Sequence, residues 1–285
     1  MDILPQLFAN SVIAGALYAL LALGFNFLYR TVKFFDLSYG AIAAVGGYTV
    51  FALSKSANLA LWFSAPAGVL AGAGLAWLVN WLIYRPLRAR RASNLVLLVA
   101  ALGVMTILQA ALAIIFSSQF RTLAVGPSTV VEIAGGVYTV TQLVILAAAF
   151  LALAALYLLK RTRLGKSVEA VADDAEVARI VGLNVNRIIS LVCVTSGAMA
   201  GLAGLLVGFD TGLEPTMGLA LLLKGVIAAI VGGLGTNAGA ALGGFLLGGV
   251  ENFGIWQISG EWKDAIAFGL LIIFLLFRPQ GILKR

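Results

Sequence analysis

Apolar stretches close to 20 residues long recur from one end of the chain to the other. A helix needs about 20 mostly apolar residues to cross the hydrocarbon of a bilayer. The 285-residue chain is 61% hydrophobic and only 11% charged, and its mean hydropathy is +1.04, which is too apolar for an average soluble domain. We therefore expect the bilayer to be its solvent. The candidate segments are 8–28, 35–53, 61–83, 95–116, 139–159, 188–208, 218–233, 238–257 and 263–277.

Two of these segments are short, contain glycine and carry a charged residue. Asp36 lies in 35–53 and Lys224 lies in 218–233. Such segments are typical of broken or partly inserted helices. The predicted fold class is all-α: a polytopic transmembrane helix bundle of about eight or nine spanning or partly spanning helices, in a single domain over residues 1–285.

The distribution of positive charge predicts the orientation of the bundle, because an excess of Lys and Arg marks the cytoplasmic side. With the amino terminus outside, fifteen of the nineteen cations fall inside and three outside, while Lys224 lies within a segment. We therefore expect an external amino terminus and a cytoplasmic carboxyl terminus. The inner cations are Arg30, Lys33, Arg85, Arg88, Arg90, Arg91, those from Lys160 to Arg187, Arg278, Lys284 and Arg285, and the outer ones are Lys55, Arg121 and Lys263.

Residues 11–53 and 190–233 share one pattern: a full-length apolar segment, a polar break and a short segment with glycines. The short segments read GAIAAVGGY and GVIAAIVGG. In the orientation above, the first pair starts outside and the second inside, which predicts an inverted repeat with a substrate path where the interrupted helices meet. Chance resemblance between apolar segments is the alternative.

Glycines also recur every four residues, for example at Gly197 and Gly201, at Gly204 and Gly208, and at Gly244 and Gly248. This spacing lets helix backbones approach closely. It fits a seam between two copies of the chain and fits tight packing within one bundle equally well.

Composition and spacing exclude several kinds of chemistry. The chain has no histidine, the usual general base and a common metal ligand. Its single cysteine, Cys193, permits neither an intramolecular disulfide nor a cysteine metal site. Gly165-Lys166-Ser167 is not a P-loop, because position 160 is lysine where that motif needs glycine. We predict no catalytic residue, no metal, no cofactor in this chain and no nucleic-acid partner.

Asp36, Lys224 and Glu251 lie in or near apolar segments, where a charge is costly unless it is paired or faces a wet cavity. They are candidate functional residues for that reason. Structural roles remain open: Asp36 as a helix cap, Lys224 as a snorkelling side chain and Glu251 at the membrane interface. As a functional residue, Lys224 has Glu251, Asp36 or the carbonyls of a broken helix as possible partners.

The longest polar interval, 160–187, is the predicted cytoplasmic loop, and its residues 167–182 have helical periodicity. The pattern fits a solvated connecting helix and fits a docking element that presents an apolar stripe to a partner. The stripe consists of Val168, Val171, Ala175, Ala178 and Val181 or Gly182.

Four stretches resemble the permeases of branched-chain amino-acid ABC importers: FDLSYGAIAAVGGY, RLGKSVEAVADDAEVARIVGLNVNRI, PTMGLALLLKGVIAAIVGGLGTNAGAALGGFLLGGVEN and KDAIAFGLLIIFLLFRPQGIL. The resemblance covers nearly the whole chain and is closer to the H-type permease than to the longer M-type. It implies a membrane subunit that works with a second related permease or a second copy, two cytoplasmic ATPases that bind the ATP, and a soluble substrate-binding protein.

Within the loop, Glu169, Ala170 and Gly182 match the segment by which such permeases engage their ATPases, which favours docking. The carboxyl-terminal matches include Lys224 and Glu251. The chain departs from the family where members commonly read N-F-A-H-G-E, because residues 35–41 lack the histidine and the glutamate of that motif. The candidate ATPase-coupling residues are Glu169, Ala170, Asp173, Asp174, Arg179 and Gly182, and the translocation-path candidates are Asp36, Ser38, Tyr39, Gly40, Gly46, Gly47, Lys224, Gly232, Gly233 and Glu251.

The function that this resemblance implies is that of a permease in a bacterial cytoplasmic membrane, which translocates aliphatic amino acids by alternating access driven by separate ATPases. Urea or short amides are the alternative cargo. A stand-alone channel would need a continuous polar stripe along several helices, which the sequence does not show. An intramembrane enzyme would need a nucleophile or metal cluster at membrane depth, and the sequence shows none.

Overall fold

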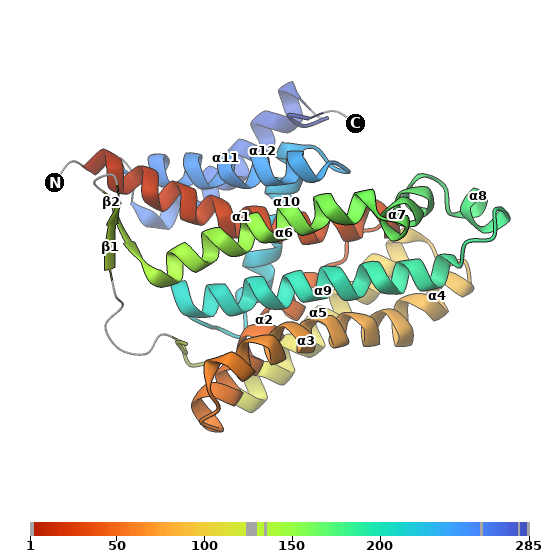
Figure 1. The fold of residues 1–285 in the computed structure, drawn as a ribbon, viewed down its shortest axis with the longest axis horizontal. Helices are drawn as coiled ribbons and strands as arrows, with labels where there is room; N and C mark the ends of the chain where they lie inside the picture. The colour runs from red at the N-terminus through yellow and green to blue at the C-terminus, as the bar shows by residue number, and fades with distance from the viewer. Residues whose placement is uncertain (1–2, 124–129, 134–135, 257–258, 279, 284–285) are drawn as a thin grey trace. The chain divides into compact units, whose positions relative to one another are not determined.

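The fold is that of a computed structural model, described for residues 3–123, 130–133, 136–256, 259–278 and 280–283. Lys284 and Arg285, at the end of the last basic cluster, lie outside the described residues. The elements in chain order (Figure 1) are α1 (Ile3–Val32), α2 (Ser38–Phe51), α3 (Leu61–Val79), α4 (Arg85–Ala89), α5 (Asn94–Phe116), β1 (Val130–Ile133), β2 (Gly136–Thr139), α6 (Val140–Arg161), α7 (Arg163–Asp173), α8 (Ala175–Ile180), α9 (Val185–Asp210), α10 (Met217–Gly232), α11 (Asn237–Ile255) and α12 (Lys263–Phe277).

Every predicted segment is helical, so the predicted all-α polytopic class is confirmed. Within the described residues, six helices are long and apolar enough to cross a bilayer. The two segments expected to be incomplete, now α2 and α10, have only 14 and 16 residues. Helix α12 is also short, at 15 residues, which the sequence analysis did not single out. The six long spans are Leu4–Val32, Leu61–Ala89, Asn94–Phe116, Val140–Arg161, Val185–Asp210 and Asn237–Ile255.

The chain divides into two compact units whose boundaries fall within α1, α6 and α10. Unit 1 comprises residues 1–26, 124–154 and 223–285, and unit 2 comprises residues 27–123 and 155–222.

Unit 2 is built around α9, which packs against both α2 and α3 (Figure 1). The helices meet through glycine: a Cβ at Gly204 would clash with the Ala43 carbonyl, and one at Gly72 would clash with the Gly197 carbonyl. The spacing of glycines along α9 therefore serves packing within one bundle. A core cluster lies beside this seam and contains Ala44, Tyr48, Val50, Leu112, Leu123, Leu205 and Leu213.

Unit 1 repeats the arrangement with other helices. A Cβ at Gly244 of α11 would meet Ala19 of α1, and one at Gly243 would clash with the Ala228 carbonyl of α10. In unit 1, α11 therefore packs on α1 and α10. In unit 2, α3 packs in the same way on α9 and α2. Each unit takes its long first helix from one half of the predicted repeat and its short second helix from the other. The common packing supports a repeat, and the inverted orientation stays a prediction.

A two-stranded antiparallel hairpin, β1 and β2, precedes α6 in unit 1, where the sequence analysis expected only a connection. Val130 pairs with Thr139, and Glu132 pairs with Val137. The amide side chain of Gln6 accepts from the Val137 backbone N–H at 2.9 Å and donates to its carbonyl at 3.2 Å. The start of α1 is thereby fixed to this hairpin.

Candidate translocation and coupling sites

Lys224 and Glu251 form a buried ion pair between α10 and α11 in unit 1. The Glu251 side chain is fully buried, and its Oε2 accepts a hydrogen bond from the Tyr18 hydroxyl at 2.7 Å. The Lys224 ammonium also lies 5.8 Å from the centre of the Tyr18 ring. Three helices therefore meet at this pair, which satisfies the polar groups that each would otherwise bury alone.

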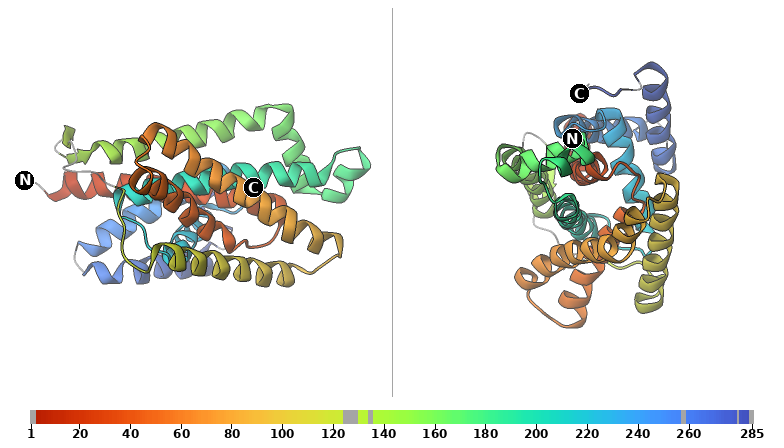
Figure 2. Two further views of the ribbon diagram at one scale, coloured as in Figure 1. Left: turned by 90° about the horizontal axis from the view of Figure 1, so that it is seen from below. Right: turned by 90° about the vertical axis from the view of Figure 1, so that its right-hand side faces the viewer.

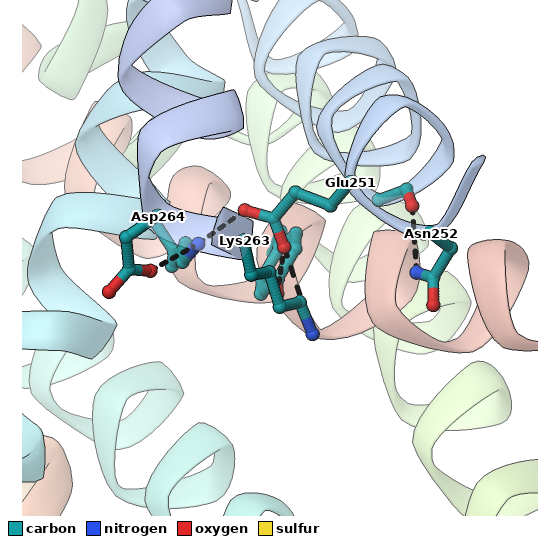
Figure 3. A network of polar contacts seen from close by, with 7 residues as sticks. Glu251, Asn252, Lys263 and Asp264 are labelled. Carbon is teal, nitrogen blue, oxygen red and sulfur yellow. Dashed lines mark hydrogen bonds and ion pairs between the residues drawn. The ribbon is translucent and has the colours of Figure 1, made fainter. Parts of the chain in front are cut away.

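The start of α12 completes the cluster (Figure 3). The Lys224 Nζ lies 2.8 Å from Asp264 Oδ1, and the Lys263 Nζ lies 3.8 Å from Glu251 Oε2. Two cations and two carboxylates thus neutralise one another. Of the partners considered for Lys224, Glu251 is confirmed. Both residues are buried within the protein, and their depth in the bilayer stays a prediction.

Asp36 forms a separate buried cluster in unit 2, just before α2. Its Oδ1 accepts from the Ser38 backbone N–H at 2.9 Å, from the Ser38 hydroxyl at 2.6 Å and from the Tyr84 hydroxyl at 2.6 Å. The N-cap residue of α2 is Leu37, and Asp36, one residue earlier, binds the first backbone N–H of the helix. Among the described residues no cation lies within ion-pair distance of this carboxyl group.

A π-helical turn, Asn80–Tyr84, positions Tyr84, whose hydroxyl donates to Asp36. Within this turn Asn80 and Tyr84 are buried, while Trp81 and Leu82 are exposed. The Asn80 side chain donates to the Ser190 hydroxyl of α9 at 3.0 Å and accepts from Arg88 at 2.6 Å. Such turns are often found at functional sites.

The remaining translocation-path candidates are buried helix contacts. Tyr39 is buried at the start of α2. A Cβ at Gly46 or Gly47 would meet the backbone of α9, and one at Gly40 would clash with the Gly218 carbonyl. In unit 1, Gly232 ends α10 against Gly239, and Gly233 has a φ of +110°. Whether any of them contacts a substrate stays a prediction.

The predicted helix 167–182 is two helices, α7 and α8, so the prediction of one helix is wrong. Asp174 interrupts it in an extended conformation, with a φ of −148° and a ψ of 113°. Its carboxylate accepts from the backbone N–H groups of Glu176 and Val177 at 2.8 and 3.0 Å. An aspartate that caps a new helix competes with continuation of the old one.

The first part of the predicted apolar stripe faces the chain itself, because Val168, Val171 and Ala178 are buried. Its last position is open and joins two other apolar side chains at the end of α8: Val177 is 55% exposed, Ile180 is 83% exposed and Val181 is 69% exposed. Figure 1 and the left panel of Figure 2 show this end of the loop beside the start of α9. This exposed apolar group on α8 is available to a partner.

The coupling candidates differ in position. The Glu169 carboxylate lies 3.5 Å from Arg30 and 3.9 Å from Lys160, which anchors α7 to the ends of α1 and α6. Ala170 is half-buried on α7, whereas Asp173 and Arg179 are exposed. Gly182 is exposed with a φ of +89° and turns the chain toward α9.

Three of the predicted inner basic clusters gather at one end of unit 2. Glu169 joins Arg30 to Lys160, and Arg85 lines the same cavity as Arg179. Arg121 pairs with Leu213 beyond the other end of α9, and 26 helical residues separate the two ends by about 39 Å. This separation agrees with the charge asymmetry, and the identity of the cytoplasmic side stays a prediction.

Sequence reasoning missed several members of these sites. Tyr84, Asn80 and Ser190 are ordinary polar residues in apolar segments, and only the π turn brings two of them inward. Lys263 and Asp264 lie at the start of α12. The sequence predicts a helix start there but not the contacts of these two residues with Glu251 and Lys224.

Six long apolar helices in the described residues are those of a multi-pass membrane protein. The chain belongs to the family described as branched-chain amino acid transport system / permease component, whose model matches residues 7–275. It is 34% identical to the high-affinity branched-chain amino acid transport system permease protein BraD of Pseudomonas aeruginosa, over 98% of this chain and 95% of that protein.

Two further relatives come from Escherichia coli K12. LivH, a permease protein of the same description, is 32% identical over 99% of this chain and 96% of its own length. LivM, also described as a permease protein of such a system, is 26% identical over 94% of this chain and 68% of its own length. The solved structure of PsaBC from Streptococcus pneumoniae in complex with Fab resembles the fold, with a TM-score of 0.56 and 13% identity over 98% of this chain and 93% of that one.

Proposed function

We propose that this chain is the H-type permease subunit of an ABC importer for leucine, isoleucine and valine in the bacterial cytoplasmic membrane. The names of BraD and LivH support this cargo. LivM, a second permease named for the same kind of system in the organism that carries LivH, supports pairing with a related permease. Two ATPases and a soluble binding protein complete the proposed importer.

The observation that carries the proposal is the open apolar end of α8. Val177, Ile180 and Val181 are exposed on a polar loop, where apolar side chains gain free energy only when a partner covers them. Glu169 anchors the preceding helix, α7, to the ends of α1 and α6. An ATPase that binds α8 thus engages a short helix next to this anchored one.

In this mechanism α9 transmits the movement. It begins directly after α8 and packs along α2 and α3 through glycine contacts. Tightly packed helices shift as bodies rather than deform locally, so a displacement of α8 moves the α2 and α3 contacts as well. ATP binding in the partner subunits supplies the free energy for alternating access.

The test combines co-purification with uptake in proteoliposomes that contain the candidate ATPases and binding protein. Ile180→Asp places a charge where the partner would bury it, so the ATPases are lost from the complex and leucine uptake falls at least about tenfold. Leu164→Asp makes the same change at an exposed apolar residue of α7 outside the proposed contact, and it retains both ATPases.

Uptake without ATPases would contradict the proposal and support a channel. Uptake of urea in preference to leucine would contradict the cargo but leave the class of importer standing. Glu169→Gln and Gly182→Ala are expected to keep the ATPases bound while lowering the uptake per ATP hydrolysed, because they loosen or strain the mounting of α8.

A further inference from the structure

A cavity of about 780 Å³ lies within unit 2, between the α3–α4 end and the loop from α8 to α9. Arg85, Arg88 and Arg91 line one side of it, and Arg179, Glu176 and Asn186 line the other. Four cations against one carboxylate leave a net charge of +3. Among the described residues, none of the four arginines lies within 4.0 Å of a carboxylate oxygen.

Arg88, at the edge of the cavity, has two hydrogen-bond donors without acceptors. Its Nη2 donates to Asn80, but its Nε and Nη1 are buried and have no hydrogen-bond acceptor. A buried guanidinium donor without an acceptor is costly. An anion with several oxygens in the cavity would offset the repulsion among the arginines, and phosphate matches the guanidinium fork of those that line it.

The helix face that ends at Arg85 indicates which kind of phosphate would bind there. Trp77 and Trp81 stack at a centroid distance of 6.0 Å with an interplanar angle of 4°, and they are 45% and 48% exposed. Arg85 follows Trp81 by four residues, so the three side chains follow one helix face toward the end of the Leu61–Ala89 span. Exposed tryptophans one and two helical turns from a cation near a span end are typical of the region where the acyl chains of a lipid meet its headgroup.

We propose that this cavity binds the phosphodiester headgroup of an anionic membrane lipid, with its acyl chains along Trp77 and Trp81. Arg85, Arg91 and Arg179 hold the phosphate, Arg88 adds positive charge, and Asn186 adds a polar contact. Because Arg179 belongs to α8, the bound lipid joins the end of α3 to the loop. The site requires only a membrane and stands independently of the proposed cargo and ATPases.

Quenching of tryptophan fluorescence by brominated lipids in mixed vesicles tests the site. Wild-type protein prefers brominated phosphatidylglycerol over brominated phosphatidylcholine at Trp77 and Trp81, and Trp77→Phe with Trp81→Phe removes that excess quenching. Arg85→Gln, Arg91→Gln and Arg179→Gln together lower the preference by about 100-fold, at about fivefold for each arginine.

The matched control removes three cations of the same region that do not line the cavity: Arg90→Gln, Arg163→Gln and Lys166→Gln. This variant keeps the wild-type preference. If the triple cavity variant fails to fold, Arg179→Gln alone, on the exposed side of α8, lowers the preference by about fivefold. Arg179→Lys keeps the charge and retains most of the preference.

Equal quenching by both lipids in the wild-type protein would overturn the proposal, as would an equal loss in the control variant. Displacement of the preference by millimolar inorganic phosphate or glycerol phosphate would assign the cavity to a soluble anion instead. No lipid preference, combined with loss of ATPases from the cavity variant, would assign the arginines to an acidic face of a partner protein.

Discussion

At the scale of single residues, the buried charges of α10 and α11 are paired with each other and with the start of α12. Lys224, Glu251 and Asp264 form a neutral group with Lys263, and Tyr18 binds the remaining oxygen of Glu251. Breaking a buried pair leaves one charge without compensation, which costs more than the intact pair contributes. The cluster therefore joins α10, α11 and α12 whatever else it does.

Lys224→Met is expected to destabilise the protein by about 3–5 kcal/mol, because Glu251 would remain buried without its closest cation. Thermal unfolding in detergent measures the loss. Lys55→Met, at an exposed residue, is the control and changes stability by less than about 0.5 kcal/mol. A double variant with Glu251→Gln recovers part of the loss, and equal stability of Lys224→Met and wild type would refute the role of the pair.

Tyr84→Phe removes the hydroxyl that donates a hydrogen bond to the buried Asp36 carboxyl group. A hydrogen bond to a charged group contributes about 1.5–3 kcal/mol, so this loss of unfolding free energy is expected. Tyr157→Phe breaks a hydrogen bond to Arg161 at an exposed position and serves as the comparison, with a loss below about 1 kcal/mol. Losses of equal size would show that Asp36 does not depend on Tyr84.

The sequence identified Asp36, Lys224 and Glu251 because a charge in an apolar segment needs a reason. It did not identify Tyr84 or Asn80, because a tyrosine or asparagine in such a segment is common and its partner depends on packing. Which charges pair is a property of the folded chain, and only the Lys224–Glu251 pair was among the possibilities considered.

At the scale of elements, the helix positions follow from hydropathy, whereas their interruptions depend on short polar signals. The apolar runs predicted every helix of the bundle, including the two shortened ones with glycine and charge. The break at Asp174 and the π turn at Asn80–Tyr84 escaped prediction. Each interruption depends on one or two local hydrogen bonds, and the spacing of apolar residues in the sequence does not reveal them.

Gly204→Ala tests the close approach of α2 and α9. Its added Cβ would clash with the Ala43 carbonyl, and the backbone cannot move aside as a side chain would. We expect a loss of about 3 kcal/mol or more in thermal or denaturant unfolding. Gly103→Ala on α5 adds the same methyl group where no atom lies within 4 Å, and it stabilises slightly because alanine favours helix. Similar effects of the two changes would contradict close packing at Gly204.

At the scale of the whole molecule, the gathering of basic clusters at one end of unit 2 fixes an expectation for topology. Replacement of Cys193 by serine leaves a cysteine-free chain for labelling. Lys166→Cys is then expected to react only with reagents that reach the cytoplasm, and Ser118→Cys, near Arg121, with impermeant reagents added outside. The reverse pattern would invert the orientation and place the α8 loop beyond the reach of cytoplasmic ATPases.

The exchange of helices between the two halves of the chain has a consequence for biosynthesis. A ribosome that feeds this protein into the bilayer releases α2 and α3 long before it makes α9, and it releases α1 before α10 and α11. The glycine-lined faces of the early helices therefore remain in contact with lipid or with the insertion machinery until their counterparts emerge. A nascent chain that stops after α5 has neither unit complete, so assembly waits for the last part of translation.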